Sequence, residues 1–476
     1  MLSYLSYLKI RPRAAIASSL LLTGCATVKP QAAFQSVQDQ VAAQTGFRTT
    51  WNQNSADDQR AEAAVRNILA HPLSADDAVR VALLGNPELQ ASFEEIGISK
   101  ADLVQAGLLH NPTLMASWRF PDRPPSITDS EYSIAADFLD LVMIPMRVKI
   151  SRANLEQTEL RLDHEVLRLV TEVKSAFYEY QGDVQLMARL DLIGEVDRQG
   201  ADLAKAQHDA GNITDLELAD REAQSALAHV YLANAKKEKL AAREKLNRLM
   251  GLSDAGLDWK AAPNLPELPA HDGSLANLES RALAQRRDLA AAKREVDALA
   301  MALALKTNTR FVPTEIRIGV DTEKSSDTGQ HLTGPTLDLT LPIFDQGQGD
   351  IAKLTAQHHM AERRMQALAI RIRSDVRQAR ETLKMQRELA EYYRKTVVPL
   401  NLKIVNDTQA QFNAMQKSTY DLFAGKQREL EAEKGYVEAW RDYWIARAEL
   451  EQAVGGRLSG AAPAKSLSQN SNGKLP

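Results

Sequence analysis

The sequence is poor in cysteine, aromatic residues and excess positive charge. Cys25 is the single cysteine among 476 residues, so the chain cannot form an internal disulfide. Aromatic residues account for only 5 % of the chain, while Ala, Leu, Glu, Gln, Lys and Arg fill long segments. This composition is typical of long helices and coiled coils. The formal net charge of -4 lacks the basic surplus that gives nucleic-acid-binding proteins their affinity.

Motifs of known enzyme chemistry are also missing. The sequence contains no phosphate-binding P-loop, no HExxH metal motif and no recognisable Ser-His-Asp arrangement. The segment QHHM, residues 357–360, invites a copper-site interpretation, because imidazole and thioether groups bind copper. However, neighbouring residues on a helix point about 100° apart, and no further histidine follows three or four positions later. We therefore interpret this segment as solvated surface and expect no enzyme activity, cofactor or metal site.

The N-terminus has the pattern of an export signal. Three basic residues precede the apolar run 14–22, which leads into Leu-Thr-Gly-Cys. This tetrapeptide resembles the bacterial lipobox, which implies a signal peptide over residues 1–24 and a lipid anchor on Cys25. The alternative is an ordinary signal peptide with an incidental cysteine. The rest of the sequence has no run of about eighteen apolar residues, so it either stays in water or crosses a membrane as β-structure.

The chain repeats itself at an offset of about 200 residues. Three pairs of segments align in the same order: 74–89 with 274–289, 110–114 with 311–315, and 208–218 with 412–422. We expect two copies of one unit, each a short helical part, a strand pair and a long helical hairpin. The expected divisions are an N-terminal arm at 25–73, a first repeat at 74–250, a Pro/Gly-rich linker at 251–273, a second repeat at 274–454 and a tail at 455–476.

Each repeat contains a candidate strand pair, at 113–143 and 313–343. In the second pair Ile316, Ile318 and Val320 alternate with polar residues, the period of a half-buried strand. The strand 336–341 is expected to run into Pro342, and the matching first-repeat strand into Pro145. Such alternation fits either one face of a soluble antiparallel sheet or a membrane strand between lipid and a watery lumen.

Long helical hairpins are expected at 148–250 and 350–454. From Ile351 onward, apolar residues recur at alternating spacings of three and four, as in a coiled-coil seam. A helix over 351–411 would be about 90 Å long at 1.5 Å per residue. Pro399 is expected to kink or loosen it.

These features together resemble the TolC-type outer-membrane efflux proteins, in their lipoprotein branch. The resemblance covers residues 74 to 454 and is carried by the duplicated plan, ALLGNPEL at 82–89, LPIFDQGQG at 341–349 and the paired helical tips. The segment TGFRTTWNQ, 45–53, is similar to the heavy-metal efflux variety. The implied fold is mainly α with a small membrane β part. Three chains would form a twelve-stranded β-barrel, continued by a periplasmic α-barrel.

The resemblance implies a passive exit duct in the outer membrane that exports small solutes, either metal cations or drugs. Its implied partners are two further copies of the chain, a periplasmic adaptor and an inner-membrane pump of the RND type. Two alternatives stay open, namely a type I protein-secretion duct and a non-transporting coiled-coil lipoprotein that braces the envelope. The alternating strands argue against the brace, which does not need them.

Site residues follow from the same resemblance. Lys417 and Asp421 occupy the positions of a periplasmic gate, in which three such pairs would close the end of the tube; the alternative is an ordinary i,i+4 surface pair. Ala424 departs from the family pattern, where a second acidic residue is common. The hairpin tips, and with them the adaptor contacts, are expected at Gly211, Thr214, Glu217, Met415 and Ser418. Met415 replaces the glycine that the first tip retains.

Overall fold

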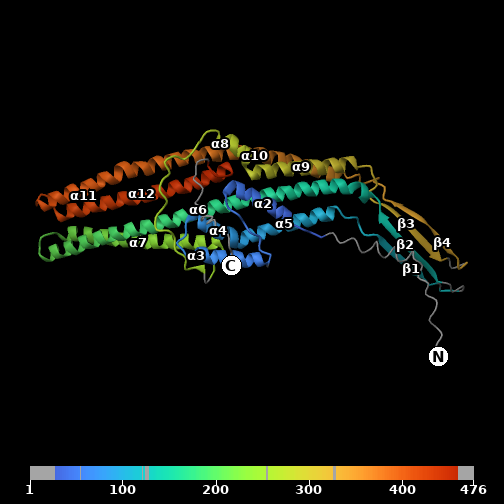
Figure 1. Ribbon diagram of the computed structural model, residues 1–476, viewed down its shortest axis with the longest axis horizontal. Helices are drawn as coiled ribbons and strands as arrows, with labels where there is room; N and C mark the ends of the chain where they lie inside the picture. Colours follow the sequence, from blue (N-terminus) through green and yellow to red (C-terminus); the bar gives the residue numbers. More distant parts are fainter. Residues whose placement is uncertain are drawn as a thin grey trace, which may run out of the picture. The chain divides into compact units, whose positions relative to one another are not determined.

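The computed structural model describes residues 27–53, 55–120, 122–123, 128–253, 256–324 and 328–458 (Figure 1). The predicted signal peptide, the predicted lipidation site Cys25 and most of the predicted tail lie outside these residues. The chain divides into two compact units. One contains Glu95–Leu155 and Asp297–Ala356, and the other contains Phe34–Glu94, Glu156–Val296 and the chain from Gln357 onward.

The first unit contains a four-stranded antiparallel sheet in the order β1-β2-β3-β4. Its strands are β1 (Thr113–Arg119), β2 (Asp129–Asp137), β3 (Ile316–Lys324) and β4 (His331–Leu339). The pairing of β2 with β3, for example Ile134 with Val320, joins the strand pairs of the two repeats into one sheet. Three of the four strands have nine residues.

The strand boundaries differ from the expected ones in two places. In the second repeat, β3 extends through Lys324, and β4 begins at His331, before the expected strand start at residue 336. In the first repeat, β2 ends at Asp137, so the expected strand through residue 143 was wrong, and Pro145 lies inside a helix. The Asp137 carboxylate accepts the Leu139 backbone N–H at 2.9 Å, which starts the helix early. Pro145 then costs the helix one backbone hydrogen bond.

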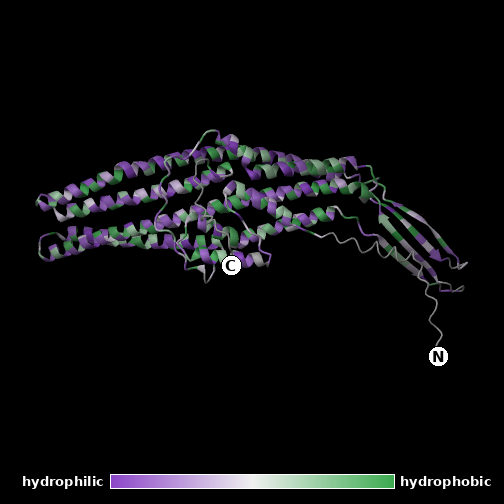
Figure 2. Cartoon of the chain, viewed as in Figure 1, coloured by the Kyte–Doolittle hydropathy of each residue, from purple (hydrophilic) through white to green (hydrophobic). Residues whose placement is uncertain are grey.

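Helices make up most of the chain, and Figure 2 shows hydrophobic and hydrophilic residues alternating along them. The long helices are α5 (Pro87–Ala106), α6 (Leu139–Asp209), α7 (Asp215–Met250), α9 (Arg287–Asn308), α10 (Gln348–Tyr392), α11 (Val398–Asn413) and α12 (Thr419–Val454). The shorter ones are α2 (Gln31–Thr45), α3 (Ala56–Leu69), α4 (Ala75–Gly85) and α8 (Leu278–Gln285). Within the described ranges, none of these helices has the combination of length and hydropathy that a membrane-spanning helix requires.

The duplication is visible in how the helices end. Asn86 and Arg286, 200 positions apart, each break a helix and donate their backbone N–H to the carbonyl four residues earlier. Gly251 and Gly455, 204 positions apart, end α7 and α12 in the left-handed conformation that favours glycine. The two copies therefore share their helix boundaries as well as their order of elements.

Pro399 loosens its helix as predicted. A π-helical turn, η2 (Tyr393–Val397), separates α10 from α11, and the N–H of Val398 reaches back to the Tyr393 carbonyl. Because proline has no N–H and its ring crowds the carbonyl four residues earlier, the wider turn accommodates it without ending the helix.

The linker after α7 is held by side chains that donate to its backbone carbonyls. Arg243 donates to the carbonyl of Trp259 at 3.0 Å, and the indoles of Trp440 and Trp444 both donate to the carbonyl of Pro266 at 2.8 Å. A segment rich in proline has few N–H groups with which to make its own secondary structure. Its carbonyls are therefore satisfied by the helices that it crosses.

The second unit, which contains most of the helices, buries the acidic side chain of Asp163 in its interior. Asp163 of α6 has no solvent-exposed side-chain surface, and Arg287 approaches it to 3.8 Å. Within the described chain its two carboxylate oxygens have no hydrogen-bond partner. Burial raises the pKa of Asp163 to about 7, against the opposing effect of Arg287.

Candidate functional site

The sheet presents large apolar side chains to solvent on one face. Residues paired directly across antiparallel strands share a face, so Leu114, Ile134 and Val320 lie in one row across three strands. Eight large side chains make up this surface, the apolar sheet face, with exposed fractions between 41 % and 73 %. They are Leu114, Trp118, Tyr132, Ile134, Ile318, Val320, Leu337 and Leu339.

The opposite face carries ionised side chains. Arg119 of β1 pairs with Glu131 of β2 at 3.2 Å, and β3 places Asp321 and Glu323 on the same face. Met115 and Leu332 are the large apolar residues among them. We call this surface the charged sheet face. A soluble sheet normally covers its apolar face with other parts of the protein, whereas here the apolar residues are the exposed ones.

Aromatic side chains lie at both ends of the sheet. At the end away from the helices, the indole N–H of Trp118 donates to the Tyr132 hydroxyl at 3.1 Å, and the rings pack edge to face. Phe120, which follows β1, is 79 % exposed. At the helical end, the exposed aromatic residues are Phe138, Phe311 and Phe344. Two aromatic belts flanking an apolar band are typical of strands in contact with a membrane.

The two hairpin tips in the helical unit have matching backbone turns. Gly211 has φ 75° and Met415 has φ 60°, so the methionine adopts the left-handed conformation that its glycine counterpart adopts freely. Its side chain is 95 % exposed. The sequence comparison of the two tips therefore identified equivalent turn positions, although the residue types differ.

Both return helices begin with a capping box. The Thr214 and Ser418 hydroxyls accept the backbone N–H of Glu217 and Asp421, and these carboxylates accept the N–H of the capping residues in return. Such reciprocal hydrogen bonds satisfy donors that a helix terminus otherwise leaves free. Hydrogen bonds from the Ser418 backbone and side chain lower the pKa of Asp421, with a smaller effect from Lys417.

The structure changes the interpretation of the predicted gate pair. Lys417 Nζ lies 3.7 Å from Asp421, and both side chains are nearly half exposed. Lys417 precedes the capping residue Ser418, however, so Lys417 lies outside α12 and the two residues do not share a face of that helix. Within a single chain such an exposed pair contributes little to stability.

Sequence reasoning missed a contact that joins the two tips. The Tyr420 hydroxyl donates to the Gln207 side-chain oxygen at 2.6 Å, and the Arg221 guanidinium lies 4.8 Å from the centre of the Tyr420 ring. These three residues, together with Leu216, lie where the hairpins of the two repeats end. In the sequence, this contact is indicated only by an aromatic residue, Tyr420, two positions after the capping Ser418. Such a short pattern does not stand out from the rest of the sequence.

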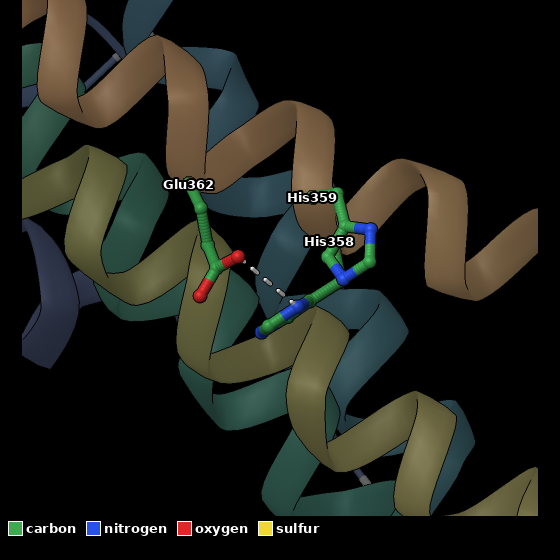
Figure 3. Close-up of side chains that lie close together, drawn as sticks. All are labelled: His358, His359 and Glu362. Carbon is green, nitrogen blue, oxygen red and sulfur yellow. Dashed lines mark ion pairs between the residues drawn. The ribbon is translucent and has the colours of Figure 1, made fainter.

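The adjacent histidines of α10 meet a third potential ligand. His358 Nδ1 lies 3.8 Å from a Glu362 carboxylate oxygen, and one ligand atom from each of His358, His359 and Glu362 lies within 4.8 Å of the others (Figure 3). The sequence interpretation considered only further histidines at the i+3 and i+4 positions. It overlooked Glu362, which occupies both positions relative to the two histidines.

Comparison with known proteins found one curated relative and several solved structures, and no family model matches the chain. The cobalt-zinc-cadmium resistance protein CzcC of Cupriavidus metallidurans is 21 % identical over 261 residues. That match covers 55 % of this chain and 61 % of CzcC, so it spans about three fifths of the relative.

Outer-membrane channels are among the solved structures that match. The Campylobacter jejuni CmeC channel matches with a TM-score of 0.69 at 16 % identity, over 82 % of this chain and 87 % of that one. The open state of the Neisseria gonorrhoeae MtrE channel matches with a TM-score of 0.64 at 17 % identity, over 81 % and 89 %. The chain therefore has the fold of the TolC-type outer-membrane channel proteins that its sequence pattern resembles.

Proposed function

We propose that this chain is the outer-membrane component of a tripartite efflux system and forms a passive exit duct as a homotrimer. The observation that carries the proposal is a sheet with exposed apolar residues on one face and ionised residues on the other. In a closed barrel the apolar sheet face would contact lipid and the charged sheet face would line a water-filled lumen.

The sheet cannot close by itself. Among the described strands, none pairs with the outer edge of β1 or of β4. Unpaired strand edges are not tolerated in lipid, and closed barrels need about eight strands or more. Three copies would supply twelve strands and pair every edge, β4 of one copy against β1 of the next.

The dimensions of the sheet agree with a membrane barrel. A strand of nine residues is about 30 Å long at 3.3 Å per residue. Tilted by about 40°, it spans about 23 Å along the barrel axis, close to the 25 Å apolar band of outer-membrane barrels. The aromatic residues at its two ends would then lie at the two membrane surfaces.

The helical hairpins would extend the tube into the periplasm, with a lipid on Cys25 as a second attachment to the outer membrane. We propose that the hairpin tips receive a periplasmic adaptor, which links the duct to an inner-membrane pump of the RND type. The capping boxes support this role, because they hold the turns at both tips in defined conformations.

We propose that the cargo is divalent transition-metal cations, because the chain is similar to a cobalt-zinc-cadmium resistance protein. A strain lacking the gene should become more sensitive to zinc, cobalt or cadmium, and the intact gene should restore tolerance. Sensitivity to drugs alone would reassign the cargo, and loss of a secreted protein alone would favour the secretion duct.

The duct itself is tested on the detergent-purified chain. Light scattering should give the protein mass of three chains, and insertion into a planar lipid bilayer should produce steps of ion conductance. A stable monomer that conducts no ions would refute the duct and favour the structural lipoprotein.

A further inference from the structure

We infer that His358, His359 and Glu362 on α10 form a binding site for one divalent transition-metal ion such as Zn²⁺. The inference goes beyond transport, because it concerns ion binding by one turn of one helix and does not require a trimer, a barrel or a pump.

The three ligands come from a rigid support. All lie within the uninterrupted helix α10, at positions i, i+1 and i+4, so that Glu362 follows one histidine by four residues and the other by three. These are the spacings at which helical side chains meet. Ala361, in the same turn, is 5 % exposed, so this turn is anchored by packing while the ligands stay accessible.

The distances are close to those of a metal site. Zn²⁺ binds imidazole nitrogen and carboxylate oxygen at about 2.1 Å, which places tetrahedral ligands about 3.4 Å apart. His358 Nδ1 and the Glu362 oxygen are 3.8 Å apart, and the whole set lies within 4.8 Å. A shift of the order of 1 Å completes the geometry, and rotation about side-chain bonds can provide it. Figure 3 shows the His358 ring and the Glu362 carboxylate approaching each other beside α10.

The donor set determines the class of ion. Two imidazoles and one carboxylate suit borderline divalent ions such as Zn²⁺, Co²⁺, Ni²⁺ and Cu²⁺, whereas Mg²⁺ and Ca²⁺ require mainly oxygen ligands. Two histidines and one glutamate are also the protein ligands of some zinc sites that leave a fourth position open. Water would fill the remaining positions here.

Among the residues that the structure describes, no lysine or arginine pairs with the Glu362 carboxylate. The ion-pair partner of Glu362 is His358 itself, and the neighbouring Arg363 donates instead to Gln366, one turn further along the helix. An ion entering the site would therefore replace a single weak and partly exposed pairing.

The test is calorimetric titration of Zn²⁺ into the metal-free, detergent-purified full chain without a histidine tag. The variant His358→Ala/His359→Ala removes both imidazole ligands and should weaken the tightest Zn²⁺ binding by at least about tenfold. Removal of a residue that only supports a metal ligand already weakens metal binding by that amount. The matched control is His229→Ala on α7, an exposed histidine that should leave the affinity unchanged. Binding that the double variant retains within tenfold would belong to other histidines and would overturn the inference.

A pair of substitutions at Glu362 tests the geometry without removing a histidine. Glu362→His places a third imidazole four residues after His358 and should retain or tighten Zn²⁺ binding, while Glu362→Leu should weaken it about tenfold. Circular dichroism should show unchanged helix content in both. If the two variants bind Zn²⁺ equally, residue 362 is not a ligand and the proposed site is wrong.

Discussion

Replacing Asp272 with asparagine would remove a negative charge that three helical side chains share. The Asp272 carboxylate, 8 % exposed, lies 2.9 Å from Arg387 of α10 and 3.1 Å from Arg447 of α12. It also accepts a short hydrogen bond from the Tyr443 hydroxyl. This one residue therefore fastens the end of the linker to two long helices.

The expected loss in free energy of unfolding follows from the burial of Asp272 and of the two arginines that contact it. The Arg447 side chain is 7 % exposed and that of Arg387 is 19 % exposed, so neither guanidinium can recover full hydration when its partner is lost. Removing one member of a buried ion pair costs about 3–5 kcal/mol. Asparagine keeps an oxygen that accepts one hydrogen bond, so we expect about 3 kcal/mol for Asp272→Asn and about 5 kcal/mol for Asp272→Ala.

The measurement has two parts, because a chain of this size need not unfold in one step. Urea denaturation followed by circular dichroism should show an earlier midpoint for Asp272→Asn. Limited proteolysis of the folded chain should cut the linker over 256–273 faster. The control is Glu267→Gln on the same linker, an exposed residue whose replacement should cost less than about 0.5 kcal/mol.

One outcome would refute this reasoning. If Asp272→Asn matched Glu267→Gln in both urea midpoint and cleavage rate, the two arginines would be stable without their shared carboxylate, and the linker would be held by its backbone contacts alone. A double variant, Asp272→Asn/Arg387→Met, separates charge from packing. Arg387 also pairs with Glu391 at 3.1 Å and donates to the carbonyls of Pro269 and Ala270, so this double variant should recover stability only to the extent that the loss in Asp272→Asn comes from the uncompensated charge of Arg387.

Three further predictions concern the sheet, the tip and the buried carboxylate. Val320→Lys, on the apolar sheet face, should cost about 2–4 kcal/mol and reduce membrane insertion, whereas Asp321→Lys on the charged sheet face should insert normally; equal insertion of the two would contradict a lipid-facing role. Lys417→Ala should leave the trimer intact and raise bilayer conductance, and it is preferable to changing Asp421, which also caps α12; unchanged conductance would remove the pair from the gate. Burial raises the pKa of Asp163 to about 7, so above about pH 4 the folded chain holds a proton that the unfolded chain has lost, and stability should fall as pH rises from about 4 to 7. Asp163→Asn should flatten that part of the stability profile, measured by thermal melts, and an unchanged slope would mean that Asp163 is ionised in the folded chain.

The sequence by itself determined the features that arise from local periodicity. Spacings of three and four predicted the long helices, and strict alternation around Ile318 predicted which side chains share a strand face. Both patterns record which side of an element is buried or lipid-facing, so they can be read without knowing the partner element. The repeat at about 200 residues likewise predicted two copies of the same order of elements, and the structure adds that their helices end at matching positions.

The tertiary structure decided the features that depend on contacts distant in sequence. The pairing of β2 with β3 joins strands about 180 residues apart in the printed sequence, and the anchoring of the linker depends on where Asp272 meets Arg387 and Arg447. Neither contact has a periodic signal, because its strength comes from burial and charge pairing after the chain has folded. The start of α6 was misjudged because the strand alternation does not show where the helix begins. The Asp137 carboxylate accepts the Leu139 N–H at that point, and the helix continues through Pro145.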